Sequence, residues 1–137
     1  MVRKTPSSHF FILTSYFFPQ VVLSTIVDEI ERLREEAWLG DAVLSLFVRD
    51  WLLVTRSREF SSAERAALFE LFTSNQFLSR FGEPSRVEAE IGRVYRSGGV
   101  PEAFTFIEAK FLKRFLTAAG KRGYYIEKPA SILRPGG

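Results

Sequence analysis

The sequence predicts an all-α protein, and three observations support this class. Apolar residues recur at spacings of three and four through most of the chain. Two Ser-x-x-Glu pairs, Ser61 with Glu64 and Ser85 with Glu88, have the pattern of a helix capping box. Strand-like sequence is confined to residues 9–18 and 124–126. Because 137 residues suit one domain with its own core, we expect a single helical bundle.

Two helices are expected in the first part of the chain. From Val22 to Leu33 apolar side chains recur at helical spacing with charged residues between them, which predicts an amphipathic helix that begins at Pro19. Residues 37–54 are almost wholly apolar and predict a buried helix.

Three further helices are expected, over about 61–81, 85–96 and 101–119. Gly82 ends the first of them and Gly120 ends the third. A turn at Gly98 and Gly99 separates the second helix from the third, which begins at Pro101.

The chain divides by composition into an aromatic N-terminal extension of uncertain role (1–20), a helical domain (21–120) and a basic tail (121–137). The extension has the basic start and apolar centre of a signal peptide, but it contains Thr14, Ser15 and Tyr16 and lacks a small-residue cleavage site. We expect a strand or helix packed on the domain. Export, membrane anchoring and an extension not needed for folding are the alternatives. We expect a cytoplasmic protein without a membrane partner.

Composition excludes several kinds of chemistry. The chain has no Cys and a single His, so it lacks a thiolate nucleophile, a cysteine-ligated metal and a histidine cluster, and Ser-His-Asp chemistry is effectively excluded. Any metal must therefore be held by carboxylates. Oxygen ligands favour magnesium, manganese or calcium.

Charge is distributed unevenly along the chain. Residues 1–85 carry 9 Lys and Arg against 11 Asp and Glu, whereas residues 86–137 carry 10 against 5. A basic surface on one side attracts a polyanion such as nucleic acid, although solvated helix faces also explain such a bias.

Two carboxylates stand in apolar surroundings. Asp41 follows Leu39-Gly40, and Glu108 follows Phe106-Ile107. An unpaired carboxylate in such a helix would cost several kcal/mol of desolvation, so each needs a cation or hydrogen-bond donors. Two such side chains on two helices could hold a hard divalent ion. The alternatives are that Asp41 caps a helix from Ala42, and that Glu108 pairs with the basic residues of 110–114.

The octapeptide Ala37-Trp38-Leu39-Gly40-Asp41-Ala42-Val43-Leu44 resembles the signature helix of the ribonuclease III family. Family members usually have Glu where this chain has Ala37, and Asp where it has Thr105. The mini-ribonuclease III branch, which lacks a double-stranded-RNA-binding domain, has a small residue and a threonine-type residue there and keeps one Asp and one Glu. Asp41 and Glu108 match that retained pair.

Two further stretches resemble the same branch, and the resemblance runs from about Ala37 to Arg114. Residues 92–101 resemble its basic Ser-Gly turn, and residues 74–76 resemble its central helix. The chain departs from the pattern in the short link from Pro101 to Thr105, in Arg96 at a lysine position, and in residues 110–112, which replace an apolar-apolar-glycine sequence. From the short tail after Arg114 we expect no appended RNA-binding domain, as in this branch.

The resemblance implies a helical bundle like the endonuclease domain of ribonuclease III, and it implies the activity of that family. Such a protein is a homodimeric endoribonuclease that uses Mg²⁺ or Mn²⁺ to cleave double-stranded or structured RNA, including ribosomal RNA precursors. Asp41 and Glu108 would be catalytic and share the metal. Trp38 would lie in the dimer interface, with core packing as its alternative role. The residues expected to contact RNA phosphates are Arg93, Arg96, Lys110, Lys113 and Arg114.

Two other functions fit the sequence. Ala37, Thr105 and the altered residues after Glu108 are compatible with a non-catalytic ribonuclease III-like domain that binds RNA or scaffolds a ribonucleoprotein. The aromatic N-terminus is compatible with a tethered amphipathic interaction module.

Overall fold

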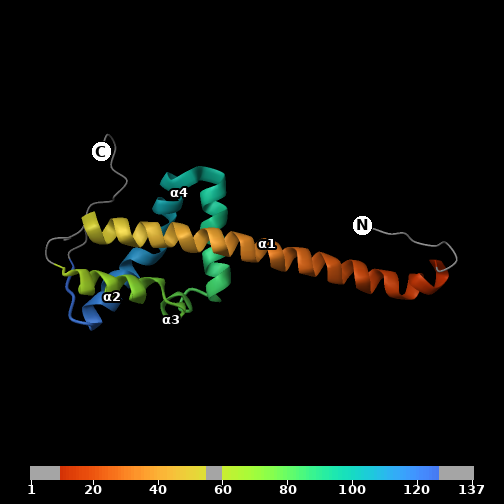
Figure 1. Ribbon diagram of the computed structural model, residues 1–137, viewed down its shortest axis with the longest axis horizontal. Helices are drawn as coiled ribbons and strands as arrows, with labels where there is room; N and C mark the ends of the chain where they lie inside the picture. The colour runs from red at the N-terminus through yellow and green to blue at the C-terminus, as the bar shows by residue number, and fades with distance from the viewer. Residues whose placement is uncertain (1–9, 55–59, 127–137) are drawn as a thin grey trace. The chain divides into compact units, whose positions relative to one another are not determined.

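The computed structural model describes residues 10–54 and 60–126, with side chains described from residue 20 onward. Its helices are α1 (Phe10–Val54), α2 (Ser62–Thr73), α3 (Asn75–Leu78) and α4 (Pro84–Lys121) (Figure 1). No strand occurs within these ranges, and both candidate strand segments lack one wherever they are described. The predicted all-α class is confirmed.

The chain separates into two units, Met1–Arg32 and Leu33–Gly137. The described part of the first unit consists of the first 23 residues of α1, Phe10 to Arg32. The second unit holds the rest of α1 together with α2, α3 and α4, and it contains the hydrophobic core. Within the described residues, no helix is both long and apolar enough to span a lipid bilayer.

α1 is one continuous helix where the sequence predicted two. Residues 34–37, Arg-Glu-Glu-Ala, are all good helix formers and include no breaker, so the two predicted segments join. The predicted start at Pro19 is also wrong, because the helix already begins at Phe10.

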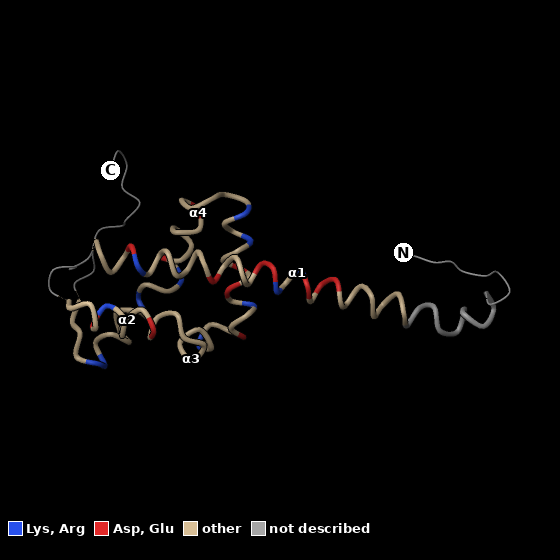
Figure 2. Tube along the Cα trace, in the orientation of Figure 1, with Lys and Arg blue, Asp and Glu red and all other residues tan. Residues whose placement is uncertain are grey.

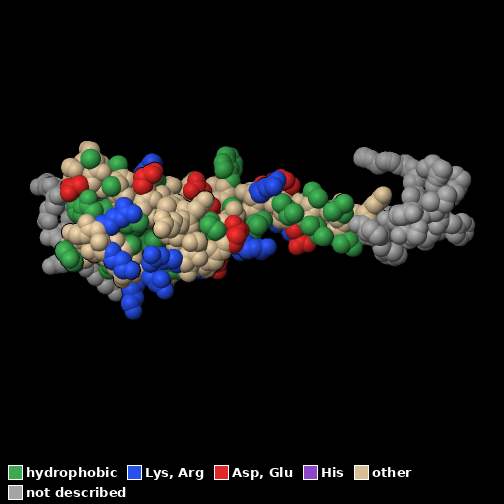
Figure 3. All heavy atoms as spheres, turned by 90° about the horizontal axis from the view of Figure 1, so that it is seen from below, with side chains coloured by type: hydrophobic (Ala, Val, Ile, Leu, Met, Phe, Trp, Pro, Cys, Tyr) green, Lys and Arg blue, Asp and Glu red, His purple; other side chains and the backbone are tan. Residues whose placement is uncertain are grey.

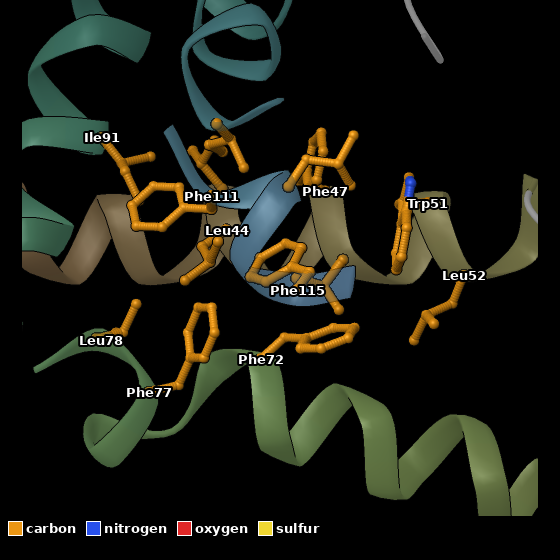
Figure 4. Packing of buried hydrophobic residues seen from close by; sticks show 14 of the residues in the cluster. Leu44, Phe47, Trp51, Leu52, Phe72, Phe77, Leu78, Ile91, Phe111 and Phe115 are labelled. Atoms are coloured by element: carbon orange, nitrogen blue, oxygen red, sulfur yellow. The ribbon is translucent and has the colours of Figure 1, made fainter. Parts of the chain in front are cut away.

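The core of the second unit is built from aromatic rings that meet around Phe115 (Figure 4). The Phe115 ring stacks on Phe72 with centroids 4.3 Å apart, and it lies 5.1 Å from Phe77 and 6.0 Å from Trp51. Phe47 adds an edge contact to Phe104 at 5.2 Å. Burying rings of this size contributes roughly 2–3 kcal/mol each. The phenylalanines that are buried in the described core are Phe47, Phe72, Phe77, Phe104, Phe111 and Phe115.

α2 begins with the predicted capping box. The Glu64 backbone N–H donates to Ser61 Oγ at 3.0 Å, and the Ser61 N–H donates to Glu64 Oε1 at 2.8 Å. The helix ends at Thr73, however, rather than near Phe81. Ser74 ends α2 and starts α3, because its hydroxyl donates to Leu71 O at 2.9 Å and accepts from the Phe77 N–H at 3.1 Å.

α4 begins one residue before the predicted capping box. Glu83 is the N-cap, and its carboxylate accepts from the N–H groups of Ser85 and Arg86 at 3.1 and 3.3 Å. Pro84 occupies the first helical turn, which favours this start. The predicted box of Ser85 with Glu88 is therefore wrong, and the Glu88 side chain is available for another contact.

α4 bends sharply at the predicted glycine turn. Gly99 has φ 74° and ψ −167°, a backbone conformation that residues with a Cβ rarely adopt. Residues 84–98 form the first arm of α4 and residues 100–121 form the second arm, and Figure 1 shows the change of direction between them. The second arm continues through Gly120 to Lys121 instead of ending at the glycine.

Candidate functional site

The first arm of α4 runs across α1, and the two backbones touch where they cross (Figure 1). A Cβ built on Gly40 would overlap the carbonyl oxygen of Glu88 and lie 2.9 Å from the nitrogen of Gly92. A Cβ built on Gly92 would overlap the carbonyl oxygen of Glu36. Only glycine at both positions allows so close an approach. The approach brings the residues next to the two glycines close to the other helix.

The crossing brings Asp41 of α1 against Glu88 of α4. Burial raises the pKa of Glu88 from 4.5 to about 7, assisted by a hydrogen bond from its protonated form to Asp41 and by the negative charges of Asp41 and Glu83. Each of these effects disfavours the ionised form of Glu88. The Asp41–Glu88 pair is therefore a place where a bound proton or a cation relieves repulsion between two carboxylates.

Asp41 differs from the sequence-based expectation in two respects. It lies inside α1, so the alternative that it caps a helix starting at Ala42 is wrong. Its side chain is also exposed, because Asp41 lies at the edge of the buried face of α1, beside Leu44, rather than at its centre. Desolvation is thus a problem for Glu88 rather than for Asp41.

Glu108 lies half-buried on the second arm of α4. The interactions described for Asp41 involve Glu88, and residues 10–54 and 60–126 contain no group of three or more His, Cys, Asp or Glu side chains suited to a metal ion. Metal sharing between Asp41 and Glu108 stays a prediction. The Thr105 hydroxyl donates to Pro101 O at 3.0 Å within its own helix, and Ala37 is buried.

The donor set of the Asp41–Glu88 pair suits a hard divalent ion. Mg²⁺ is commonly held by one or two carboxylates and keeps several waters that substrate phosphates can replace. Asp41 is exposed and Glu88 is partly so, which leaves room for such ligands. Two carboxylate side chains that face each other are compatible with this coordination.

Sequence reasoning missed Glu88 because Ser85 offered a local explanation for it. A signal was nevertheless present in the sequence. Gly92 follows Glu88 by one helical turn, and Gly40 precedes Asp41 directly, so each helix has a small residue beside its carboxylate. Paired small residues on two helices are what a close crossing requires.

The predicted RNA-contacting residues fall into three groups. Arg93 pairs with Glu36 at 3.1 Å and Lys110 with Glu90 at 2.7 Å, so each contacts an acid of its own chain. Arg114 lies over the Phe81 ring, 5.8 Å from its centroid. Arg96 and Lys113 are exposed.

Positive charge recurs along α4, and acidic residues are concentrated in residues 28–36 of α1 (Figure 2). Figure 3 shows Lys and Arg side chains gathered on one face of the second unit. RNA contact by any of the five predicted residues stays a prediction.

Trp38 has 82% of its surface exposed, so the alternative that it packs in the core is wrong. An exposed tryptophan ring on the signature segment is available for contact with another molecule. Its place in a dimer interface stays a prediction.

Comparison of this chain with protein-family models, with curated proteins and with solved structures found no match. The resemblance to ribonuclease III therefore depends on the motifs of the sequence.

Proposed function

We propose that this protein is a divalent-metal-dependent endoribonuclease that cleaves double-stranded or structured RNA. The observation that carries the proposal is the contact of Asp41 with Glu88 at the crossing of α1 and α4. It supplies two oxygen ligands for a cation next to an arm of α4 that carries basic residues. Its sequence context, Leu39-Gly40-Asp41-Ala42, is the segment that resembles the ribonuclease III signature.

Asp41 and Glu88 would hold Mg²⁺ or Mn²⁺, and the resemblance adds Glu108 as a third ligand. When bound, the metal supplies Lewis-acid activation of water and charge neutralisation at a phosphate. The close backbone contact at Gly40 and Gly92 holds the backbones of α1 and α4 together beside Asp41 and Glu88, so the two side chains extend from neighbouring points.

The basic residues would orient the RNA. Arg96 and Lys113 are exposed and would contact backbone phosphates directly, by charge and shape rather than by base sequence. Arg93 and Lys110 would have to break their ion pairs with Glu36 and Glu90 before they could contact RNA. If the ion pairs persist, their role is to keep these two acids away from the RNA. We place the activity in the cytoplasm and in maturation of structured RNA such as ribosomal RNA precursors. The resemblance implies that the active form is a homodimer with Trp38 at its interface.

A second candidate is a non-catalytic RNA-binding domain. In the described part of the chain, no group of three or more His, Cys, Asp or Glu side chains is arranged to hold a metal ion, which favours this function. Thr105 in place of an acid is a further point for this function.

The deciding experiment incubates the purified full chain with labelled duplex RNA and Mg²⁺, Mn²⁺ or chelator. Asp41→Asn, Glu88→Gln and Glu108→Gln test the three carboxylates, and Asp50→Asn, an exposed aspartate on the same helix as Asp41, is the matched control. We expect metal-dependent cleavage that Asp41→Asn and Glu88→Gln abolish and Asp50→Asn retains.

The other outcomes separate the candidates. Salt-sensitive binding without cleavage in every metal would exclude the nuclease and support the binding domain. Cleavage that survives Asp41→Asn and Glu88→Gln would exclude the proposed site. Loss of cleavage in Glu108→Gln alone would indicate that the metal binds on the second arm of α4 and not at Asp41 and Glu88.

A further inference from the structure

The sequence of α1 contains a seven-residue repeat that begins 14 residues before the Ala37–Leu44 motif and runs through it. With Leu23 at position a, the a and d positions of four successive heptads are all apolar or small, and they are followed by one more a position: Leu23, Ile26, Ile30, Leu33, Ala37, Gly40, Leu44, Phe47 and Trp51. A sustained a/d pattern of this kind is typical of a helix that packs lengthwise against a partner.

The nine a and d residues form one stripe along α1. The second half of this stripe packs against other parts of the same chain. Ala37 is 7% exposed, and Leu44, Phe47 and Trp51 are fully buried in the core of the second unit. At Gly40 the first arm of α4 covers the stripe by direct backbone contact.

The first half of the stripe is exposed. Leu23, Ile26 and Ile30 have 60%, 46% and 43% of their surface accessible, and the flanking Val22 and Val27 have 55% and 48%. Figure 3 shows hydrophobic side chains on the surface of this part of α1. Five large apolar side chains on one helix face are more than isolated surface residues, and such patches mark interaction sites.

The residues beside the stripe determine which partner fits. Glu29 occupies position g and Arg34 occupies position e of the next heptad. In a parallel pair of identical helices, g of one chain meets e of the following heptad of the other, five residues later. Glu29 would therefore meet Arg34 of a second copy, twice per dimer. Val22 and Val27 have the same five-residue spacing and extend the apolar seam.

An antiparallel pair is disfavoured by the same positions, because it places g opposite g and e opposite e. In the register that pairs Leu23 with Leu33 and Ile26 with Ile30, Glu29 would then approach Glu29 of the second copy instead of Arg34. A membrane surface also fits poorly, since Asp28, Glu29 and Glu31 make the polar side of this segment acidic, whereas interfacial helices are rich in Lys and Arg.

We propose that residues 22–34 of α1 form a parallel two-stranded coiled coil with the same segment of a second copy of this chain. The pairing ends before Ala37, where α4 occupies the same face of the helix. This inference does not depend on the proposed nuclease function, and it assigns the dimer contact to a surface distinct from Trp38, which occupies position b.

The test measures the mass of the full chain in solution by sedimentation or light scattering. We expect a dimer whose dissociation constant rises at least about a hundredfold in Ile26→Asp, because a carboxylate would enter the apolar seam. Val21→Asp is the matched control. Val21 is also apolar and 42% exposed, but it lies at position f outside the seam, so this variant should remain dimeric.

Two further variants test the orientation of the helices. Glu29→Arg should weaken the dimer by about threefold to tenfold, and adding Arg34→Glu should restore it. Because the chain has no cysteine, Ile26→Cys should form a disulfide-linked dimer on mild oxidation, whereas Val21→Cys should not.

Four results would overturn the proposal. The full chain could be monomeric at all accessible concentrations, or monomeric in solution and recruited to neutral phosphatidylcholine vesicles. The dimer could persist in Ile26→Asp and dissociate in Trp38→Ala, which would assign the contact to the signature segment. A dimer without the Ile26→Cys cross-link would exclude the parallel register. Helicity of each variant, measured by circular dichroism, separates lost pairing from lost folding.

Discussion

Two segments of α1 share one repeat and have opposite environments. Leu23 and Leu44 both occupy position a, yet Leu23 is 60% exposed and Leu44 is fully buried. The difference arises from other parts of the chain, because α4 crosses the helix at Gly40 and the aromatic core surrounds residues 44–51. A helical repeat thus defines which face will pack, whereas a second element determines whether that face is covered.

The largest effect is expected where α4 covers α1. Gly40→Ala places a methyl group onto the Glu88 carbonyl oxygen, which belongs to the backbone and cannot rotate away. We expect the free energy of unfolding, measured by urea denaturation, to fall by more than about 4 kcal/mol. Gly120→Ala is the control, because its nearest atom lies 4.0 Å away in the Tyr125 ring. If both variants were equally stable, the close crossing would be refuted.

The second prediction compares the two leucines directly. Leu44→Ala removes a fully buried side chain and should cost about 3–5 kcal/mol, including the cavity that it leaves. Leu23→Ala should change the stability of the second unit by less than about 0.5 kcal/mol, measured on dilute protein. Similar losses in both variants would show that the first half of the repeat is also buried in the monomer.

The third prediction concerns the carboxylates at the crossing. The pKa of Glu88 is raised from 4.5 to about 7, so the folded state keeps this proton to higher pH than the unfolded state does. The contribution of the Glu88 proton to the free energy of unfolding is fully present below pH 4.5, and it is lost as the pH rises through 7. Discounted for the partial exposure of Glu88, the loss is about 1–2 kcal/mol.

Glu88→Gln should therefore be more stable than the parent at pH 8 by that amount, but not at pH 4. Denaturant unfolding at both pH values, with chelator present, checks this. Glu70→Gln, an exposed glutamate of α2, is the control. An unchanged pH profile in Glu88→Gln would show that the pKa of Glu88 is not raised in the folded state.

The smallest effect is expected for a feature that needs no tertiary partner. Ser61→Ala removes the hydroxyl that accepts from the Glu64 N–H at 3.0 Å, and it should cost about 1 kcal/mol in thermal or urea unfolding. Ser61→Asp should retain most of that stability, since aspartate also caps helices. A loss as large as that of Leu44→Ala would mean that Ser61 does more than cap α2.

Local signals predicted those parts of the fold that depend on neighbouring residues. The capping box at Ser61 and the glycine turn at Gly99 are both found, because caps and turns are determined within a few residues. The box at Ser85 is absent because Glu83 and Pro84 offer an earlier start. The single helix expected over 61–81 is interrupted because the Ser74 hydroxyl bonds to the backbone on both sides of it.

The candidate site was predictable only in part. Asp41 was identified by its motif, but its neighbour Glu88 lies 47 residues further along the chain, and no local pattern connects the two. The exposure of Trp38 was equally undetermined, since an aromatic residue on an apolar helix fits both a core and an interface.

The sequence by itself determined the helical class, the apolar face of α1 and the residues able to carry metal or phosphate chemistry, because periodicity, capping and side-chain type are local properties. The tertiary structure decided which half of α1 is buried and that Asp41 faces Glu88. Those outcomes depend on the meeting of Gly40 with Gly92, and contact between distant residues follows from the packing of whole helices rather than from either segment alone.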